Sequence, residues 1–444
     1  MNSLIMLIVI LLPIFCGALV PVLPFRSRKQ MDIYIEAAVL LNSILVFFML
    51  FHRPEEVFTL FRLTGNLSVS FRLDDLGTVF AAIVSLLWPL ASLYAFDYMK
   101  QEGHEKVFFM FYTMTYGITL GIALADDIMT MYCFYEMLTL VVPGGVLDPN
   151  KIGGKTNVLL LVYVLCFIGF SVKATMWPLG SWLPKAGVAP TPVTALLHAV
   201  AVVKAGAFAT IRVTYYSFGT EFLKGTWAQD ILMILAIITI VYGCSRALKE
   251  THFKRRLAYS TMSNLSYILF GALLMSPAGL VGALSHMIFH AIMKICSFFC
   301  AGAVISKTGK NYIHELDGMG RKMPVVFGVF TISGMALMGV PGLPGFISKW
   351  NLAKAAVLDG SPLALFGVGA LMISALLTAI YMMTISVRAF FPGRDFDEGS
   401  LEGVSDPGWM MIVPLCCFVI FMFVLGLHSK PVIQALTKLA AFVK

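Results

Sequence analysis

Apolar residues follow one another along this chain in long blocks, separated by short polar stretches. Most blocks have roughly the 20 residues that an α-helix needs to cross the hydrocarbon core of a bilayer. The blocks lie at 3–22, 32–51, 76–96, 107–125, 128–145, 157–179, 190–217, 228–245, 257–276, 278–306, 324–358, 361–392 and 408–427. The pattern therefore predicts an all-α polytopic membrane protein with thirteen visible spans. The first block has no basic segment before it and no small-residue cleavage site, so we interpret it as a span rather than a signal peptide.

Two stretches break this pattern. Residues 54–73 alternate apolar and polar side chains around Gly65-Asn66, which predicts a short extramembrane hairpin or loop. Residues 393–407 are polar and acidic, and we expect them to link the last two spans on a surface.

Proline interrupts two of the helical segments, one that begins near Asn157 and the block 324–358. Proline removes a backbone donor and clashes with the preceding turn, so it breaks a helix. Broken backbone at membrane depth is tolerated only inside protein or beside a water-filled cavity, and a pair of broken helices is typical of transporters built from repeats. Ordinary proline kinks are the alternative. The interrupting residues are Pro178, Pro184, Pro341 and Pro344.

Composition agrees with a membrane protein and narrows the chemistry. Of the 444 residues 59% are hydrophobic and 13% charged, against about 25% charged in soluble domains. The net charge of +8 is expected from basic cytoplasmic loops, and no basic stretch interleaved with aromatic residues suggests nucleic-acid binding. The eight cysteines lack CxxC spacing, and neither a phosphate-binding glycine loop nor a haem motif is present. We expect no cofactor and no metal in this chain.

The positions of the basic loops do not agree with the number of predicted spans between them. Loops 23–31 and 246–256 are both strongly basic and should both be cytoplasmic. Seven predicted spans separate them, and an odd number would place them on opposite sides. A fourteenth span is therefore expected to be absent from the sequence near 143–156, where the apolar pattern stops abruptly.

Ionisable residues inside the apolar blocks are the strongest functional signal. A charged side chain at the centre of a membrane helix costs roughly 2.5–3.5 kcal/mol on insertion scales, so such residues usually face a protein interior or an ion pathway. His286, His290 and Lys294 follow one another at every fourth position and so share one helix face. The candidates are Glu136, Lys173, His198, Lys204, His290, Lys294 and Lys349, with His286 as a possible accessory residue.

These residue types suit proton transfer. Loss of hydration favours the neutral form of lysine, and a nearby carboxylate opposes that effect, so a separable Lys–Glu pair changes its proton affinity with geometry. Histidine titrates near neutrality, whereas arginine does not release its proton. Simpler interpretations stay open: Glu136 could be solvated at a helix end, Lys173 and Lys294 could extend to the membrane surface, and His286 could be a packing residue.

A metalloprotease is a less suitable interpretation. His286 and His290 have the spacing of a zinc-binding helix pair, but the HExxH motif needs a glutamate after the first histidine. Met287 occupies that position.

The run from Lys173 to Gly206 resembles the signature of the antiporter-like membrane subunits. This family is shared by respiratory complex I, Mrp-type multisubunit cation/proton antiporters and energy-converting membrane-bound hydrogenases. The resemblance covers about 75–430. Supporting segments are 134–137, 254–263, 286–294 and 341–350.

The resemblance implies fourteen spans with two inverted five-helix repeats, each carrying a broken helix. On this chain the first repeat would occupy 107–217, without one helix near 143–156, and the second 228–392. The flanks would be 1–106, with the hairpin, and 393–444, a linker and last span.

The resemblance also implies roles for the buried residues. Glu136 is similar to the family's helix-5 glutamate and Lys173 to its helix-7 partner lysine. His198 and Lys204 match helix 8. His290 and Lys294 match the helix-11 connection, and Lys349 matches the last lysine beside the second break.

The function expected from this resemblance is proton translocation, with cation/proton exchange as a variant, in a multi-pass subunit of the inner (cytoplasmic) membrane. Its partners would be other membrane subunits of a redox-driven or Mrp-type complex, in a quinone reductase or hydrogenase type of assembly. The chain would have no catalytic chemistry of its own. A standalone antiporter and a structural subunit with inert charges are the alternatives. Lysines favour protons, and sodium is left open.

Overall fold

The computed structural model of the 444-residue chain describes residues 4–54, 56–64, 67–100, 104–126, 130–131, 156–187, 189–393, 396 and 398–442. Its contacts divide the chain into two compact units. The first comprises Met1–Val146 and Val200–Ala205, and the second Leu147–Ala199 and Gly206–Lys444.

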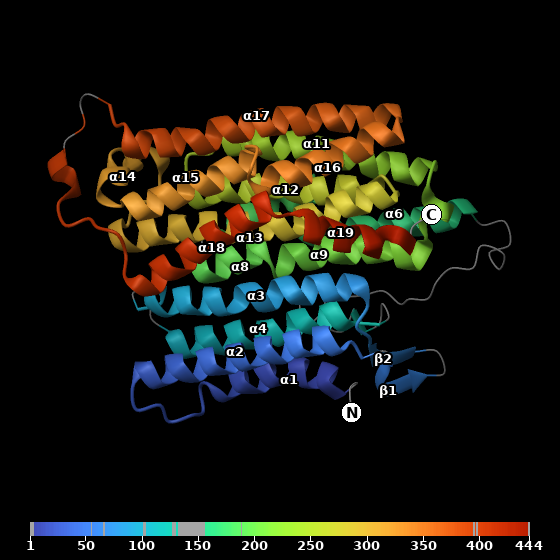
Figure 1. Ribbon diagram of the computed structural model, residues 1–444, viewed down its shortest axis with the longest axis horizontal. Coiled ribbons are helices and arrows are strands. Elements are labelled where there is room, and N and C mark those ends of the chain that lie inside the picture. The colour runs from blue at the N-terminus through green and yellow to red at the C-terminus, as the bar shows by residue number, and fades with distance from the viewer. Residues whose placement is uncertain are drawn as a thin grey trace. The chain divides into compact units, whose positions relative to one another are not determined.

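The first unit is built on four helices that run side by side (Figure 1). They are α1 (Leu4–Leu19), α2 (Arg28–His52), α3 (Asp75–Tyr98) and α4 (Glu105–Leu124). The Ser27 side chain caps α2 and the Asp74 side chain caps α3, each accepting a backbone N–H of the first turn. Glycine lets α1 and α4 meet backbone to backbone: a Cβ on Gly117 would lie 2.2 Å from the carbonyl oxygen of Ile10.

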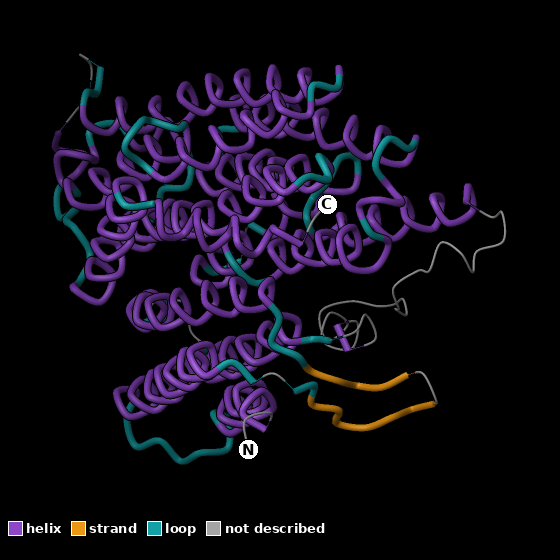
Figure 2. Tube along the Cα trace, turned by 45° about the vertical axis from the view of Figure 1, so that its right-hand side comes forward, coloured by secondary structure: helices purple, strands orange, loops and turns teal. Residues whose placement is uncertain are grey.

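A two-stranded antiparallel hairpin joins α2 to α3, as the alternating pattern at 54–73 predicts. Its strands are β1 (Phe58–Thr64) and β2 (Leu67–Phe71), and they project beyond the helix ends (Figure 2). Two ion pairs lie at its base, Arg53 with Asp75 and Arg72 with Asp126, each with an N–O distance of 2.8 Å. The prediction of a hairpin is confirmed.

The described residues of the second unit form helices joined by turns and loops, and they contain no β-strand. Its longer helices are α6 (Thr156–Lys173), α8 (Thr191–Ala199), α11 (Trp227–Lys249), α12 (Phe253–Leu273), α13 (Pro277–Thr308), α15 (Pro324–Met338), α16 (Pro344–Asp359), α17 (Pro362–Phe390), α18 (Trp409–Leu427) and α19 (Lys430–Leu439). Helix α9 (Val202–Arg212) continues from the first unit into the second and ends in the π-helical turn Val213–Phe218. Short helices fill the connections: Leu179–Ser181, α7 (Trp182–Ala186), α10 (Thr220–Leu223), Ile313–Leu316, α14 (Met319–Lys322), Glu398–Leu401 and Ala440–Phe442.

Helix α13 forms the centre of the second unit. It packs against α8, α12, α15, α16 and α18, and nearly all of its side chains from Gly279 to Val304 are buried. Such burial on every side is expected of a helix that is surrounded by protein rather than by lipid.

The helices confirm the predicted class of multi-pass helical membrane protein. Within the described ranges, nine helical segments are long and apolar enough to cross a membrane, and α1 and α15 are shorter apolar helices. Several predicted blocks coincide with helices to within a few residues, for example 361–392 with α17 and 408–427 with α18. Apart from residues 130–131, the predicted span 128–145 lies outside the described residues, as does the segment 143–156 up to residue 155.

Both interrupted segments are visible. Helix α6 ends at Lys173; Pro178 follows in the turn, and Pro184 lies in the first turn of α7, where a proline removes no hydrogen bond. Helix α15 ends at Met338 and α16 begins at Pro344.

One interruption was not expected. The predicted block 190–217 is divided, because α8 ends at Ala199 and α9 begins only at Val202. The two residues between them, Val200 and Ala201, are neither proline nor glycine, so the sequence carries no local signal for this break.

Candidate functional site: a buried line of amines, imidazoles and hydroxyls

His286, His290 and Lys294 form a polar stripe on α13. This stripe faces other helices, not the outside of the unit, and all three residues are fully buried. The Nδ1 atom of His286 hydrogen-bonds with Oγ of Ser348 on α16 at 2.9 Å, and its ring lies 5.6 Å from that of His290. The Tyr267 ring of α12 lies 5.0 Å from the His286 ring. The three residues predicted to share a helix face therefore line a protein interior.

Lys294 is held by neutral oxygen atoms. Its Nζ donates to Oγ of Ser260 at 2.7 Å and to the carbonyl of Leu257 at 3.2 Å, both on α12. Ser260 also accepts a hydrogen bond from the hydroxyl of Tyr381 on α17, at 2.7 Å. The Tyr381 hydroxyl in turn lies 3.0 Å from Thr378. Lys294 is therefore the end of a hydrogen-bonded chain that crosses three helices.

Sequence reasoning did not single out these hydroxyl groups. Ser260, Ser263 and Tyr267 recur at i, i+3 and i+7 on α12 and are all fully buried. Such spacing puts them on one helix face. Polar residues at this spacing within an apolar block were the available signal, but their partners on α13 and α17 are distant in sequence.

His198 lies on α8 and is also fully buried. Its ring stacks on Phe298 of α13, with ring centroids 4.5 Å apart. Neither ring nitrogen makes a hydrogen bond to the part of the protein that the structure describes. The charges of Lys294 and Lys254 both act on it. A buried imidazole beside two amines can accept a proton on one nitrogen and release it from the other.

Lys254 was grouped by sequence with the basic loop 246–256, but its side chain is buried. It belongs to the first turn of α12, and its Nζ donates to the carbonyl of Ala189 at 3.0 Å. Sequence reasoning missed this residue because the neighbouring Arg255 and Arg256 made the whole segment look solvated.

Lys349 lies after the second helix break, and its side chain caps the C-terminal end of α15. Its Nζ donates to the carbonyls of Leu337 and Met338, at 2.6 and 3.3 Å, and lies 5.4 Å from the centre of the Tyr267 ring. Leu337 and Met338 end α15, where carbonyls have no helical partner and the helix dipole is negative. The break thus creates an acceptor site for a cation.

The backbone at this break requires glycine. Gly339 and Gly342 have φ values of 97° and 88°, and a Cβ on Gly345 would lie 1.8 Å from the carbonyl oxygen of Ala336. Residues around the break also line a cavity of about 600 Å³ open to the surface, among them Lys349, Phe346 and Trp350.

The remaining candidates are Lys173, Lys204 and Glu136. Lys173 ends α6 and is buried, and Gly206 lies against it: a Cβ there would be 2.7 Å from the backbone nitrogen of Ala174. Lys204 is buried on α9 and belongs to the first unit. Glu136 lies outside the described residues.

The chemistry of this line is that of proton transfer. Its members are amines, imidazoles and hydroxyls, which donate, accept and release protons. Within the described ranges, no group of three or more His, Cys, Asp or Glu side chains is arranged to hold a metal ion.

The fold and this line define a helical multi-pass membrane protein with protonatable groups in its interior. The model of the family described as "NADH:quinone oxidoreductase/Mrp antiporter, TM" matches residues 74–378, more than half of the chain. The chain belongs to this family of antiporter-like membrane subunits.

Two relatives and one solved structure illustrate the similarity. NADH-quinone oxidoreductase subunit L of Rickettsia conorii is 30% identical over 339 residues, which cover 76% of this chain and 49% of that protein. NAD(P)H-quinone oxidoreductase chain 4 1 of Synechococcus elongatus is 24% identical over 480 aligned positions, covering 95% and 88% of the two chains. A chain of respiratory complex I from Thermus thermophilus, solved with bound NADH, superposes with a TM-score of 0.78 and 23% identity, over 99% of each chain.

These similarities cover different fractions of the compared chains. The solved structure shows the same helical fold, since the superposition covers 99% of this chain. The present chain spans about half the length of the Rickettsia relative.

Proposed function

We propose that this chain is a proton-translocating membrane subunit of a larger complex. The observation that carries the proposal is Lys294, which is fully buried, hydrogen-bonded only to neutral oxygens among the contacts described above, and close enough to Lys349 for their charges to interact. Among the described residues no carboxylate pairs with this lysine, so its proton can leave.

The second unit brings several basic groups within reach of one another. Lys294 and Lys254 lie close enough to His198, and Lys349 close enough to Lys294, for their charges to interact. Two like charges buried near each other repel, so protonation of one amine favours release from the next. We propose that protons pass between Lys349, Lys294 and His198, with His286 and His290 beside this path and Ser260 and Tyr381 as hydroxyl relays.

The family resemblance adds the remaining members. We propose that Glu136 and Lys173 form the entry pair and that Lys204, with His198, continues the path. Prolines would maintain the two helix interruptions: Pro178 and Pro184 in the first, and Pro341 and Pro344 in the second. The supporting observations are the burial of Lys173 and Lys204 and the cap of Lys349 on α15.

We also propose the complete family architecture: two inverted five-helix repeats at 107–217 and 228–392, within a fourteen-span plan that lacks one helix near 143–156 in this sequence. The alignment with the Synechococcus chain shows that this relative is longer. It extends over 480 positions, more than the 444 residues of this chain, so the relative has residues with no counterpart here.

The partners and location follow by analogy with the relatives. They are quinone oxidoreductase chains, and the solved structure is a respiratory complex. We propose that this chain assembles with other membrane subunits in the inner (cytoplasmic) membrane, without nucleic acid and without a cofactor of its own. Redox chemistry or cation exchange in those partners would drive the protons, and sodium would enter only as a coupled ion.

The test compares Lys294→Met with Lys307→Met in the assembled complex reconstituted into vesicles. Both lysines lie on α13, but Lys307 is exposed at its end. Proton uptake, followed with an internal pH-sensitive dye, should be lost in Lys294→Met and unchanged in Lys307→Met. Full uptake by an assembled Lys294→Met complex would contradict the proposal. Mass spectrometry of the copurified chains identifies the partners.

A further inference from the structure

A second buried polar cluster lies in the first unit, among helices that the proposed proton line does not use in its mechanism. Each of α2, α3 and α4 contributes polar side chains to it. They are Asn42 and Ser43 of α2, Ser85 and Ser92 of α3, and Tyr112, Thr113 and Tyr116 of α4, and all are buried. Burying hydroxyl and amide groups inside membrane helices is costly unless they are hydrogen-bonded. Such a cluster therefore needs an explanation.

A carboxyl group lies at one end of this cluster. Glu36 is on α2, eight residues after Arg28 and thus about 12 Å further along the helix axis. Its side chain is half-buried, and its Oε2 lies 2.5 Å from Oγ of Ser92. No basic side chain is described as pairing with it. An ionised carboxylate at this depth would be expensive.

The single proton of the Ser92 hydroxyl limits how many hydrogen bonds it can donate. Its hydroxyl lies 2.5 Å from Oε2 of Glu36 and 2.9 Å from the carbonyl oxygen of Pro89. The hydroxyl has a single proton, and a carbonyl can only accept. Both contacts are complete hydrogen bonds only when the Glu36 carboxyl brings a proton of its own and donates it to Ser92.

We propose that Glu36 is a proton-binding site of the first unit, separate from the lysine line. In its protonated state Glu36 donates to Ser92, which donates to Pro89. When the proton leaves, the Ser92 hydroxyl turns to the carboxylate and releases the Pro89 carbonyl. The same geometry thus accommodates both states with one rotation of a hydroxyl group.

Polar groups continue from Glu36 into the unit. The Tyr112 hydroxyl donates to the carbonyl of Trp88 at 3.2 Å, and the Ser43 and Tyr116 hydroxyls lie 2.8 Å apart. The Asn42 amide and the Ser85 hydroxyl are buried beside the Tyr116 hydroxyl, but their polar atoms make no hydrogen bond of ordinary geometry in the described part of the chain. Buried atoms of this kind are normally satisfied by internal water. A hydrated passage on the inner side of Glu36 would satisfy them.

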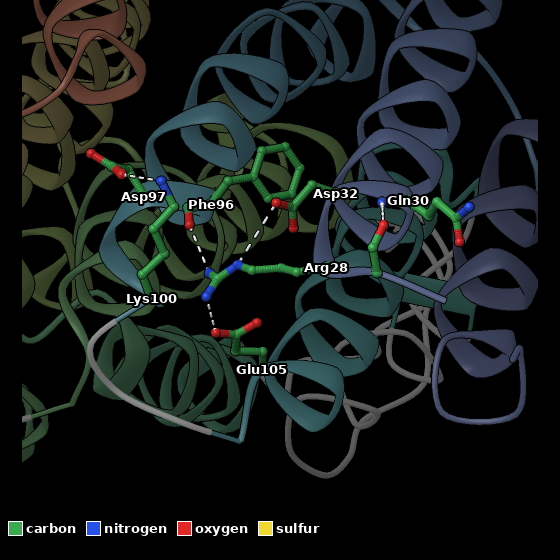
Figure 3. A network of polar contacts seen from close by, with 8 residues as sticks. Arg28, Gln30, Asp32, Phe96, Asp97, Lys100 and Glu105 are labelled. Atoms are coloured by element: carbon green, nitrogen blue, oxygen red, sulfur yellow. Dashed lines mark hydrogen bonds and ion pairs between the residues drawn. The ribbon is translucent and has the colours of Figure 1, made fainter. Parts of the chain in front are cut away.

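The other side of Glu36 leads to the basic end of α2. Asp32 lies one turn before Glu36, and Arg28 one turn before Asp32, so the three share a helix face. Arg28 forms ion pairs with Glu105 of α4 and with Asp32, at 3.8 Å for the latter, and donates to the Phe96 carbonyl of α3 (Figure 3). The Asp97–Lys100 pair lies beside this network.

A cavity of about 640 Å³ opens at the same end, and it could give protons access to Asp32 and then to Glu36. Its lining includes Arg26, Arg28, His104, Glu105 and Lys106. Titratable groups on the helices around Glu36 include Arg28, Asp32 and Tyr34 of α2, Tyr94, Asp97 and Tyr98 of α3, Glu105, Tyr112 and Tyr116 of α4, and Cys16 of α1, whose carbonyl accepts a hydrogen bond from Tyr34. None of the contacts described for these groups is an ion pair to Glu36.

Dicyclohexylcarbodiimide tests the proposal directly on the intact complex. This apolar reagent adds a protonated carboxyl across its C=N bond: the carboxyl oxygen bonds to the central carbon, and the carboxyl proton moves to nitrogen. A glutamate in water, with a pKa near 4.3, is ionised at about pH 7 and reacts little. We expect the Glu36 peptide to be labelled at that pH at least about tenfold more than the Glu105 peptide, as mass spectrometry would measure.

Two variants and one ion make the result decisive. Glu36→Gln should lose both the label and the infrared carbonyl band of a protonated carboxylic acid, whereas Glu105→Gln should keep both at Glu36. Absence of the band from the wild-type spectrum, together with absence of the label, overturns the proposal. Protection of Glu36 by sodium chloride at constant pH also overturns it, in favour of a sodium site. Because neither measurement requires turnover, failure here is distinguishable from failure of the lysine line.

Discussion

The Nζ of Lys294 and the Oγ of Ser260 lie 2.7 Å apart, in the fully buried centre of the second unit. The contact joins α13 to α12, and the hydroxyl of Tyr381 extends it to α17. A carboxylate in the place of Ser260 would form a strong charge-assisted bond and fix the ammonium. A hydroxyl supports the ammonium less strongly and can itself pass a proton. The pair therefore combines burial with reversible protonation.

Ser260→Ala should slow proton translocation roughly tenfold, because hydrogen bonds to charged groups contribute about 1.5–3 kcal/mol and 1.4 kcal/mol changes a rate tenfold. Ser333→Ala is the matched control. Ser333 is equally buried and bonds to Ser297 and to the carbonyl of Met293, both on α13, but it does not contact Lys294. Proton uptake by reconstituted complexes measures the effect. Equal slowing in both variants would assign it to packing.

Lys349 should show two separable roles. Lys349→Arg keeps a cation at the end of α15 but cannot release a proton at ordinary pH. We expect it to retain most of the thermal stability while abolishing translocation. Lys349→Met should lose both, because the carbonyls of Leu337 and Met338 then have no donor. Melting temperature and proton uptake, measured on the same preparations, check this split. Translocation by Lys349→Arg would show that this residue does not carry a proton.

The membrane helices could be predicted from sequence because hydrophobicity over about 20 residues is a local property. The block 32–51 corresponds to α2, which begins four residues earlier at Arg28. Charged residues such as Arg28 extend helices beyond the apolar core, so hydrophobicity alone places the ends too far inside. The stripe from His286 to Lys294 was predictable for the same reason, since its members share one helix.

The partners of those residues could not be predicted. Ser260 and Lys294 are 34 residues apart, and Tyr381 is 121 residues from Ser260, so only the packing of three helices joins them. Glu36 did carry a local signal, since it is an acidic residue inside the block 32–51. Its meaning depends on Ser92 of another helix.

Gly345→Ala should destabilise the protein, whereas Gly369→Ala should be nearly neutral. A Cβ on Gly345 would lie 1.8 Å from the backbone oxygen of Ala336, so α16 must move away from α15. Overpacking of this kind typically costs 1–3 kcal/mol. Gly369 lies on α17 with nothing within 4 Å of an added Cβ. Thermal unfolding of both variants in detergent measures the difference. Equal melting temperatures would contradict the close approach of α15 and α16.

Acid should loosen the connection that follows α13. There Oε2 of Glu315 accepts the backbone N–H groups of Asn311 and Tyr312, at 2.9 and 2.8 Å. The Tyr312 hydrogen bond, followed by that of Asn311, holds the pKa of Glu315 below its ordinary value of 4.5. A carboxyl whose pKa is lowered by folding stabilises the fold above its unfolded pKa, and this contribution is lost as the pH falls through the folded pKa.

Hydrogen exchange measured by mass spectrometry on a peptide spanning 309–316 checks this expectation. Protection, corrected for the intrinsic effect of pH on exchange, should fall in the wild-type protein as the pH drops below 4.5. Glu315→Gln keeps an acceptor oxygen but has no charge to titrate, so its protection should be weaker and independent of pH in this range. Phe253 donates its N–H to the Asn311 carbonyl at 2.8 Å, and this hydrogen bond should also weaken. The same pH dependence in both proteins would place the acid-sensitive group elsewhere than Glu315.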